Sequence, residues 1–486
     1  MDAVNSSEIV SDANEIDPIR MQCTAGKKYS ETAQSVASNG TEECKKQRHW
    51  SELPSLPLER IYSFLRREDQ FNMSLVCSKW SEGYGLPSVW KTFIFHLTKS
   101  QLSMDTCPVM KFVQRYSRMF RHVEVYHEFS RKKRFINTWC RHFIVFLQFL
   151  TSNSQLISVR FVGLSRLLRH IDNTTYDDIY RAIKNFLRSQ NHLQRAEFYG
   201  YSFRIQEGVE LLRILIQNNR KSLTHLVLKG FVLYDPMGQE QNSNFAQNLP
   251  ILADLPSLTT FEIDYTLIFE NMVARQCTAL QTIKSCQTLV LSKIILEYEN
   301  TMINIEDFRG LTSTDWQFLK MLSPNLQVEL IIYTDALLRR EVEFLIVPNM
   351  PITLLKYNLH RHEAFERRMI TDELFRHLLA CKTNDHLVSL NLWLWCPVQD
   401  LVSPFIPFLP ACKKLKYLVI NIHYPTNGLD LMEYWLNNRP EYLEKVNIYI
   451  WDIEDDEDYT TLKNLTSQYV SRLKLIGMNV EVEINY

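Results

Sequence analysis

The chain has 486 residues, of which 45% are hydrophobic and 22% are charged. This length is too great for one compact core, so it favours several domains or one elongated repeat array. The 54 Lys and Arg residues nearly balance the 55 Asp and Glu residues, which excludes binding to nucleic acid or an anionic membrane through overall charge.

Several classes of site are not expected. The ten cysteines form no CxxC pair and no set of four with zinc-ligand spacing, so we predict reduced thiols and no metal site. Neither GxGxxG nor GxxxxGK[ST] occurs, and no GxSxG is present, so we expect no cofactor and no catalytic activity. The apolar run FIVFLQFL is too short to span a bilayer, and the polar N-terminus does not resemble a secretory signal. We therefore expect a cytoplasmic or nuclear protein, or one found in both.

Residues 1–47 form the first predicted segment. They are rich in Ser, Asn, Glu and Lys and have almost no periodic apolar residues, which predicts a disordered tail. Such a tail is either inert or a regulatory or localisation segment, and composition favours the inert one.

A strongly apolar segment follows at residues 48–95. Leu58, Ile61 and Leu65 fall at helical spacing, and Pro57 stands where a first-turn proline is tolerated. Asp69 is placed to cap a second helix, and a third short helix follows it. Three helices of this size cannot bury so many large apolar groups among themselves, so the surplus needs a partner surface.

The stretch LPSLPLERIYSFLRREDQFNMSLVCSKW, with a later VW, resembles the F-box family, whose pattern is L-P-x-x-x-L-x-x-I-x-x-x-L, an acidic position, L-V-C-x-x-W and a final apolar-Trp pair. Besides the contact residues given below, Asp69 and Val89 match this pattern, while Tyr62 and Pro57 depart mildly from it. In that family the F-box binds the adaptor Skp1, which connects it to a cullin-RING ubiquitin ligase. The resemblance implies these Skp1-binding residues: Leu53, Pro54, Leu58, Ile61, Leu65, Leu75, Val76, Cys77, Trp80 and Trp90.

Residues 96–486 contain a recurring phrase of the form L-x-x-L-x-L. Its clear copies begin at Phe120, Leu156, Leu193, Leu223, Leu258, Ile352, Leu387, Leu415 and Leu443, and weaker ones lie near Leu289 and Leu326. Each phrase predicts a short strand with its apolar side inward. The copies recur at a step of about 32 residues, which is typical of a repeat array.

The segments between the phrases predict helices. Residues 207–219 and 371–381 each place apolar residues on one helical face. We therefore predict an α/β fold, with an N-terminal three-helix F-box followed by a curved leucine-rich-repeat-like solenoid that has a parallel sheet inside and helices outside. The regular repeats carry Asn or Cys eight positions past the leading residue. This chain lacks that ladder, so we expect an irregular curve with differently satisfied turns.

Two stretches strengthen the likeness to F-box proteins with degenerate leucine-rich repeats. They are DWQFLKMLSPNLQVELIIYT at 315–334 and EYLEKVNIYIWDIEDDEDYTTLKNL near the C-terminus. This closer likeness depends on apolar spacing as much as on identities.

The last strands suggest a surface for a protein partner. Counting alternate positions places these residues on the face away from the core: Trp393, Trp395, His423, Tyr449 and Trp451. Exposed aromatic clusters carry much of the binding energy in interfaces, although the same rings could fill the terminal core of the array. The acidic run DIEDDED at 452–458 is predicted to be a solvated loop at the edge of this surface.

Together these features predict a non-catalytic substrate-recognition subunit of a Skp1-cullin-F-box ubiquitin ligase. The F-box would hold Skp1 and the repeats would hold a protein to be ubiquitinated. One alternative is a repeat scaffold that binds Skp1 without a cullin. Another is a repeat protein whose helical segment only caps the solenoid.

Overall fold

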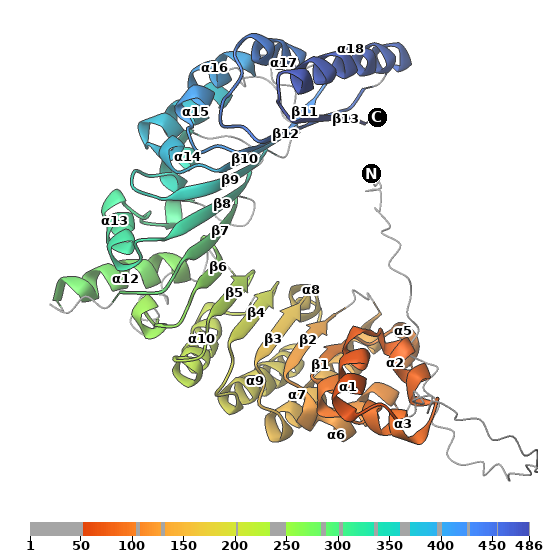
Figure 1. The fold of residues 1–486 in the computed structure, drawn as a ribbon. Coiled ribbons are helices and arrows are strands. Elements are labelled where there is room, and N and C mark those ends of the chain that lie inside the picture. The colour runs from red at the N-terminus through yellow and green to blue at the C-terminus, as the bar shows by residue number, and fades with distance from the viewer. Residues whose placement is uncertain are drawn as a thin grey trace, which may run out of the picture. The chain divides into compact units, whose positions relative to one another are not determined.

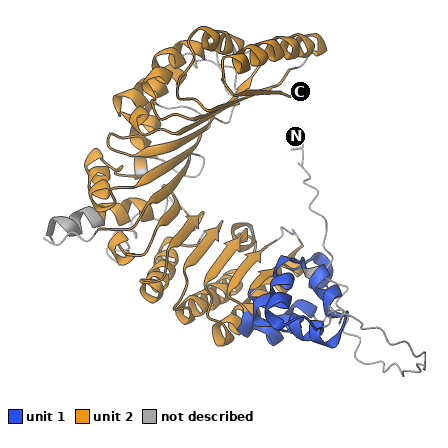
Figure 2. Ribbon diagram, in the orientation of Figure 1, with its two compact units in different colours: residues 1–91, 97–119 blue, residues 92–96, 120–486 orange. Residues whose placement is uncertain are grey.

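The computed structural model describes residues 52–103, 107–127, 132–200, 203–233, 249–282, 288–300, 305–334, 339–359, 370–395, 401–424, 428–453 and 455–485. The predicted tail lies outside these residues. The chain divides into two compact units, shown in Figure 2. Unit 1 comprises residues 1–91 and 97–119, and unit 2 comprises residues 92–96 and 120–486.

Unit 1 is helical. Its helices are α1 (Ser55–Phe64), α2 (Arg67–Ser74), α3 (Ser78–Tyr84), α4 (Pro87–Trp90), α5 (Lys99–Leu102) and α6 (Pro108–Tyr116), followed by a 3-10 turn (Ser117–Met119). Their common core consists of Leu58, Tyr62, Met73, Val89 and Trp90. The Trp90 ring stacks on Tyr116 at 5.2 Å and meets the edge of Phe112 at 4.7 Å. Residues 97–119 therefore pack with the preceding helices, beyond the segment that the sequence delimited at residue 95.

The helix boundaries in unit 1 differ in detail from those expected. Pro57 lies in the first turn of α1, where no intrahelical partner for its missing N–H is required. Asp69 does not cap α2: that helix begins at Arg67 after Arg66. The Asp69 carboxylate instead contacts Arg66 Nε at 3.2 Å. The expected exit after the third helix is a further short helix, α4, which buries Trp90.

Unit 2 is built on one sheet of thirteen parallel strands, in which every strand pairs with its neighbours in sequence (Figure 1). The strands are β1 (Thr92–Phe95), β2 (His122–Tyr126), β3 (Ser158–Val162), β4 (Arg195–Tyr199), β5 (His225–Lys229), β6 (Thr260–Asp264), β7 (Lys293–Glu299), β8 (Gln327–Thr334), β9 (Ile352–Leu359), β10 (Ser389–Leu394), β11 (Tyr417–His423), β12 (Lys445–Trp451) and β13 (Val480–Ile484). This order confirms the predicted curved α/β repeat solenoid, since each phrase from Phe120 to Leu443 leads into a strand.

Helices cover one face of this sheet and leave the other free (Figure 1). They are α7 (Lys133–Asn153), α9 (Asn173–Ser189), α10 (Ile205–Asn219), α12 (Leu267–Thr282), α13 (Ser313–Leu322), α14 (Arg339–Leu345), α15 (Ile370–Ala380), α16 (Val402–Ala411), α17 (Gly428–Asn437) and α18 (Asp456–Leu475). The short helix α8 (Leu164–Leu168) lies instead at the C-terminal ends of the early strands (Figure 1). Short 3-10 turns lie at Leu252–Asp254, Ile305–Asp307 and Thr383–Asp385. The predicted helices at 207–219 and 371–381 correspond to α10 and α15. We call the uncovered side of the sheet the helix-free face.

Side-chain alternation explains this arrangement. In β3, for example, Val159 and Phe161 are fully buried on the helix side, while Ser158, Arg160 and Val162 are half-buried on the helix-free face. Strands such as β2, β6, β10 and β12 show the same alternation, so each of these repeats buries its apolar side chains against its neighbours. On β4, β5, β9 and β11 a residue of the other face is buried as well: Glu197, Val227, Asn358 and Asn421. A register shift between Val328 and Glu329 interrupts the pairing of β8 with β9. The strand pairing is therefore irregular at this point, and the irregular curve expected from the missing asparagine ladder stays a prediction.

Buried amides at helix ends replace that ladder in the early repeats. Gln190, which follows α9, accepts a hydrogen bond from Leu156 N–H at 2.9 Å and donates one to Ser154 O at 3.1 Å. Asn219, at the end of α10, accepts from Leu193 N–H at 2.8 Å and donates to Gln190 O at 3.1 Å. These bonds satisfy backbone groups where the chain enters β3 and β4, which would otherwise be costly to bury.

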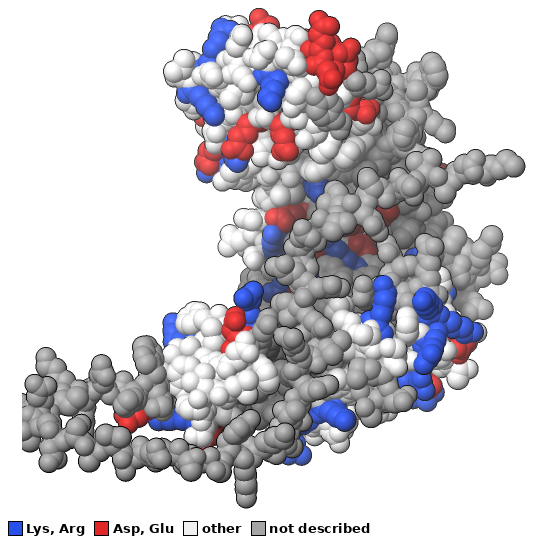
Figure 3. Space-filling model, turned by 90° about the vertical axis from the view of Figure 1, so that its right-hand side faces the viewer, with Lys and Arg blue, Asp and Glu red and all other residues white. Residues whose placement is uncertain are grey.

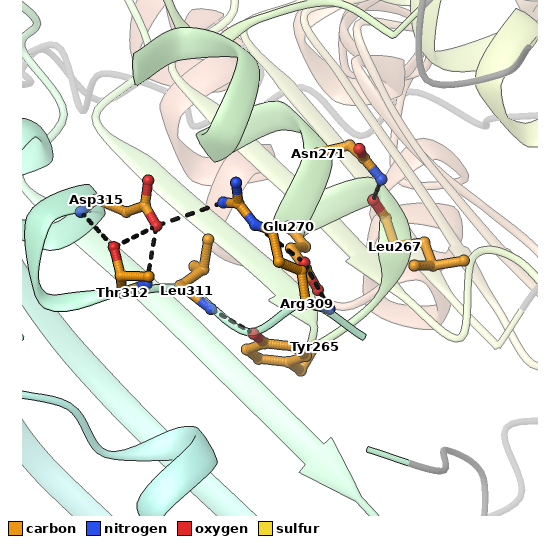
Figure 4. Close-up of polar contacts among 8 residues, drawn as sticks. All are labelled: Tyr265, Leu267, Glu270, Asn271, Arg309, Leu311, Thr312 and Asp315. Atoms are coloured by element: carbon orange, nitrogen blue, oxygen red, sulfur yellow. Dashed lines mark hydrogen bonds and ion pairs between the residues drawn. The ribbon is translucent and has the colours of Figure 1, made fainter. Parts of the chain in front are cut away.

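A polar network joins α12 to α13 (Figure 4). Glu270 on α12 accepts from Arg309 N–H at 3.0 Å, and Arg309 also contacts Asp315 at 3.4 Å. Asp315 accepts from the backbone N–H and the hydroxyl of Thr312, both at 2.8 Å, which forms a capping box at the start of α13. Tyr265 OH accepts from Leu311 N–H at 3.2 Å. The network fixes where α13 begins.

We predict that Asp315→Ala weakens α13 locally. Loss of a capping residue costs about 1–2 kcal/mol, so amide hydrogen exchange across α13 should accelerate roughly fivefold to thirtyfold. Asp372→Ala is the matched control, because Asp372 lies in the first turn of α15 and forms only an exposed pair with Arg376. Equal exchange in the two variants would contradict the role assigned to Asp315.

Candidate functional site

Unit 1 carries a group of exposed apolar side chains. Leu56 and Phe64 on α1 are 78% and 75% exposed, and Leu75 and Val76 after α2 are 68% and 64% exposed. Exposed aliphatic and aromatic side chains gathered on one small module are typical of a protein-binding surface. We call these four residues the apolar surface of unit 1.

Two of the residues expected to contact Skp1 are core residues instead. Leu58 and Trp90 are 1% and 2% exposed, and Trp90 Nε1 donates a hydrogen bond to Tyr84 O at 2.6 Å. Their side chains are closed off from a partner, so we correct their assignment from contact residues to residues that support the surface. Gly83 packs so close to Leu58 that a Cβ there would lie 2.6 Å from Leu58 Cδ2, which shows how tightly this core is filled.

The remaining predicted contact residues lie at or near the surface. Pro54, Leu75 and Val76 are exposed. The half-buried ones are Leu53, Ile61, Leu65, Cys77 and Trp80. Leu56 and Phe64 were missed because they lie off the apolar stripe that defines the helix in the sequence. Their signal was that a short helix carries large apolar residues on more than one face.

The second predicted surface lies on the helix-free face of β10–β12. The structure brings its aromatic side chains together: ring centroids are 6.1 Å apart for Trp393 and Trp395, 6.1 Å for Trp395 and Trp451, and 6.2 Å for Trp395 and His423. Tyr449 lies in register with Asn421, the neighbour of Trp393. All five predicted residues are half-buried. Their contact with a partner stays a prediction.

Carboxylates lie beside this cluster. His423 Nδ1 is 3.2 Å from Asp452 Oδ2, and Tyr424 OH donates to Asp458 at 3.0 Å. The acidic run is not a loop throughout, because Asp456, Glu457 and Asp458 form the first turn of α18, where the helix dipole favours negative charge. Figure 3 shows Asp and Glu gathered at the top of the face in view.

The helix-free face of the earlier strands carries ion pairs, which the sequence did not reveal. Arg160 on β3 contacts Glu197 on β4 at 3.2 Å and Glu124 on β2 at 4.0 Å. Lys229 on β5 contacts Glu262 at 2.8 Å and Glu297 at 2.6 Å. Counting alternate strand positions would have found most of them, since Glu124, Arg160, Glu197, Glu262 and Glu297 each fall between buried apolar residues.

Asp264 ends β6 beside these pairs. It accepts a hydrogen bond from Gly230 N–H. Burial of its carboxyl group, together with nearby Glu297, raises its pKa from 3.8 to about 7, against the opposing effects of Gly230 N–H and Lys229. The residue keeps some exposed surface although the carboxyl group itself is buried. A raised pKa in the folded state means that folding favours the protonated form, so this contribution to stability is complete below about pH 4 and is lost as the pH rises through about 7.

We predict that Asp264→Asn stabilises unit 2 at pH 8 and has little effect at pH 4. The amide keeps the size and the acceptor oxygen but carries no buried charge. The gain at pH 8 should be on the order of 3 kcal/mol, measured by denaturant unfolding at both pH values. Asp385→Asn is the control, because that carboxyl lies in a 3-10 turn away from β6. A pH dependence that is unchanged in Asp264→Asn would contradict this assignment.

The described residues offer neither a metal-binding cluster nor a membrane-spanning helix. Within those ranges no group of three His, Cys, Asp or Glu side chains could hold a metal ion. No described helix is long and apolar enough to cross a bilayer.

Residues 50–82 match the F-box domain family. The chain therefore contains an F-box domain, which is a general Skp1-binding module, and all four residues of the apolar surface of unit 1 lie within it. Among solved structures, the chain is similar to one described as the TLR13–ssRNA13 complex, with 11% identity and a TM-score of 0.24. That match covers 69% of this chain and 48% of the other. The evidence for the repeat fold is the sheet of thirteen parallel strands in sequence order.

Proposed function

We propose that this protein is a substrate-recognition subunit of a Skp1-cullin-F-box ubiquitin ligase. The observation that carries the proposal is an F-box domain whose apolar surface is exposed. Burying such side chains stabilises a complex by about 25 cal/mol per Å² of apolar area. In this role the protein is a non-catalytic adaptor, acting in the cytoplasm or the nucleus, and a recruited enzyme performs the transfer because the target is held close to it.

The repeat array supplies the second half of the proposal. Solenoids bind partners on their extended inner face, and here that face carries the half-buried cluster of Trp393, Trp395, His423, Tyr449 and Trp451. We propose that this cluster binds the protein to be ubiquitinated. Within the F-box proteins, we propose a relationship to the F-box-only proteins thirty-three and thirty-nine, on the likeness of the repeat stretches.

We predict that Leu75→Ala with Val76→Ala weakens Skp1 binding. Removing the side chains from the interface should cost on the order of 3 kcal/mol, or roughly a hundredfold in Kd, measured by titration of purified Skp1 onto the full chain. Leu58→Ala would not test the surface, because that side chain is buried and its loss destabilises the domain itself.

A matched control is available in unit 2. Leu475 and Ile476 form an adjacent apolar pair, with Leu475 87% exposed at the end of α18. Leu475→Ala with Ile476→Ala should bind Skp1 as the wild type does. If the Leu75/Val76 double variant also binds normally, the proposed F-box surface is wrong. If Skp1 co-purifies but no cullin does, the scaffold without a ligase is favoured instead.

We also predict that Trp393→Ala with Trp451→Ala releases the target protein. Truncating an aromatic anchor at an interface typically costs about 2 kcal/mol or more. Quantitative comparison of proteins bound to the wild type and to the variant should show at least one partner lost while Skp1 is retained. An unchanged set of partners, or loss of the fold in the variant, would place the target site elsewhere.

A further inference from the structure

One row of side chains crosses the helix-free face of the C-terminal strands. Register pairs Tyr333 on β8 with Asn358 on β9, Asn358 with Trp393 on β10, Trp393 with Asn421 on β11, and Asn421 with Tyr449 on β12. Tyr449 is in turn paired with Glu483 on β13. Each of the two asparagines therefore lies between two aromatic residues. We call this set the amide–aromatic row.

The two asparagines in this row are buried, and three of their polar side-chain atoms have no hydrogen-bond partner in the described part of the chain. Asn421 is 0% exposed and Asn358 is 2% exposed. Within the described part of the chain, Asn421 has no hydrogen-bonding partner for either its Nδ2 or its Oδ1, and Asn358 has none for its Nδ2. A buried amide that lacks partners destabilises a protein. A pair of them at matching positions two strands apart, on β9 and β11, therefore points to a ligand that supplies the missing bonds.

The unpaired atoms determine what that ligand must offer. Asn421 presents both a donor and an acceptor, which match the C=O and N–H of one residue in an extended peptide. Asn358 presents a donor, which matches a second peptide carbonyl. Tyr333, Trp393 and Tyr449 flank these amides, and all three are half-buried, so they can pack against the side chains of the same peptide once their rings turn aside.

We infer that the amide–aromatic row binds an extended peptide segment of the target protein, which lies across β8–β13 and hydrogen-bonds through its main chain to Asn358 and Asn421. This inference rests on the proposed function, because it names the class of target held by the same face. Main-chain recognition of this kind supplies affinity, while pockets for alternate side chains supply specificity.

Strand spacing sets the repeat of the bound peptide. Asn358 and Asn421 lie two strands apart, which corresponds to about 9.5 Å. An extended chain covers that distance in about three residues. Tyr333, Trp393 and Tyr449 follow the same two-strand spacing, so the peptide should carry bulky apolar side chains about three positions apart.

The charges at the two ends of the row determine at which end of the row the peptide should carry a basic residue. Glu483 is exposed at the β13 end, which favours Lys or Arg in the peptide at that end. Lys356 lies over the rings of Tyr333 and Trp393, at 5.9 Å and 5.3 Å from their centroids. The β8–β10 end is therefore already supplied with a cation, and a second cation there is disfavoured.

The test is selection of a display library of random twelve-residue peptides on the purified full chain. The expected result is a set of peptides with bulky apolar residues about three positions apart and a basic residue beyond one end. Their affinity should fall about fivefold to tenfold in Asn421→Leu and in Asn358→Leu, which each lose main-chain bonds. Both variants should melt at the same temperature as the wild type or higher, because an unpaired buried amide is replaced by an apolar side chain of similar size.

A second measurement is made on the wild-type chain and does not depend on how the variants fold. Methylation of the peptide nitrogens, one at a time, should reveal one position where affinity falls about tenfold, because the N–H that Asn421 accepts is lost. The same methylation should have no effect on binding to Asn421→Leu. Asn391→Leu is the control: Asn391 is half-buried on the same face of β10, accepts a hydrogen bond from Ser389 at 3.4 Å, and lies outside the row.

Three results would overturn the inference: no peptide enriched over a Trp393→Ala chain, no methyl-sensitive position, or equal losses in Asn391→Leu and Asn421→Leu. Skp1 binding is measured on the same samples. Normal Skp1 binding without peptide selection overturns only the amide–aromatic row. If the wild-type chain does not bind Skp1, the proposed adaptor function is overturned. The selected peptides would still test whether the amide–aromatic row binds an extended peptide.

Discussion

The repeat array depends on the alternation of side chains along parallel strands that are paired in unbroken order. Helix-side residues such as Val159 and Phe161 are buried in the core, so the residues between them must point to the opposite face of the sheet. Register then places each of them directly beside a residue of the next repeat. A solenoid of this kind therefore builds rows across its sheet, and the composition of each row decides what its surface can do.

Two kinds of row occur on this one sheet. In the earlier strands, opposite charges such as Lys229 and Glu297 pair with one another, so much of the face there is internally paired. In the later strands, Asn358 and Asn421 lie in register with aromatic residues, and among the described residues Asn358 Nδ2 and the Asn421 amide have no hydrogen-bond partner. The folded chain retains the cost of these amides. A bound peptide that hydrogen-bonds to the amides would remove this free-energy cost. We therefore assign binding of the target protein to the later strands and a structural role to the ion pairs of the earlier strands.

The F-box divides its apolar residues between two tasks. Leu58, Tyr62 and Trp90 fill a core that also uses residues beyond the matched F-box segment. This core holds α1–α4 together and leaves Leu75 and Val76 exposed. A residue can thus be important to partner binding without touching the partner, because a side chain that supports the core fixes the position of those at the surface.

The sequence by itself determined the F-box helices, the repeat phrase and hence the strands from β2 to β12, because helical and strand periodicities are local properties of the chain. It also placed Trp393, Trp395 and Trp451 on one face. Only the tertiary structure added β1 and β13, whose residues lack the full phrase, and moved Leu58 and Trp90 into the core. It alone also showed that, among the described residues, the Asn421 amide and Asn358 Nδ2 have no hydrogen-bond partner although both side chains are buried in rows with aromatic residues. Burial and hydrogen bonding depend on residues that are distant in sequence, and no local pattern records them.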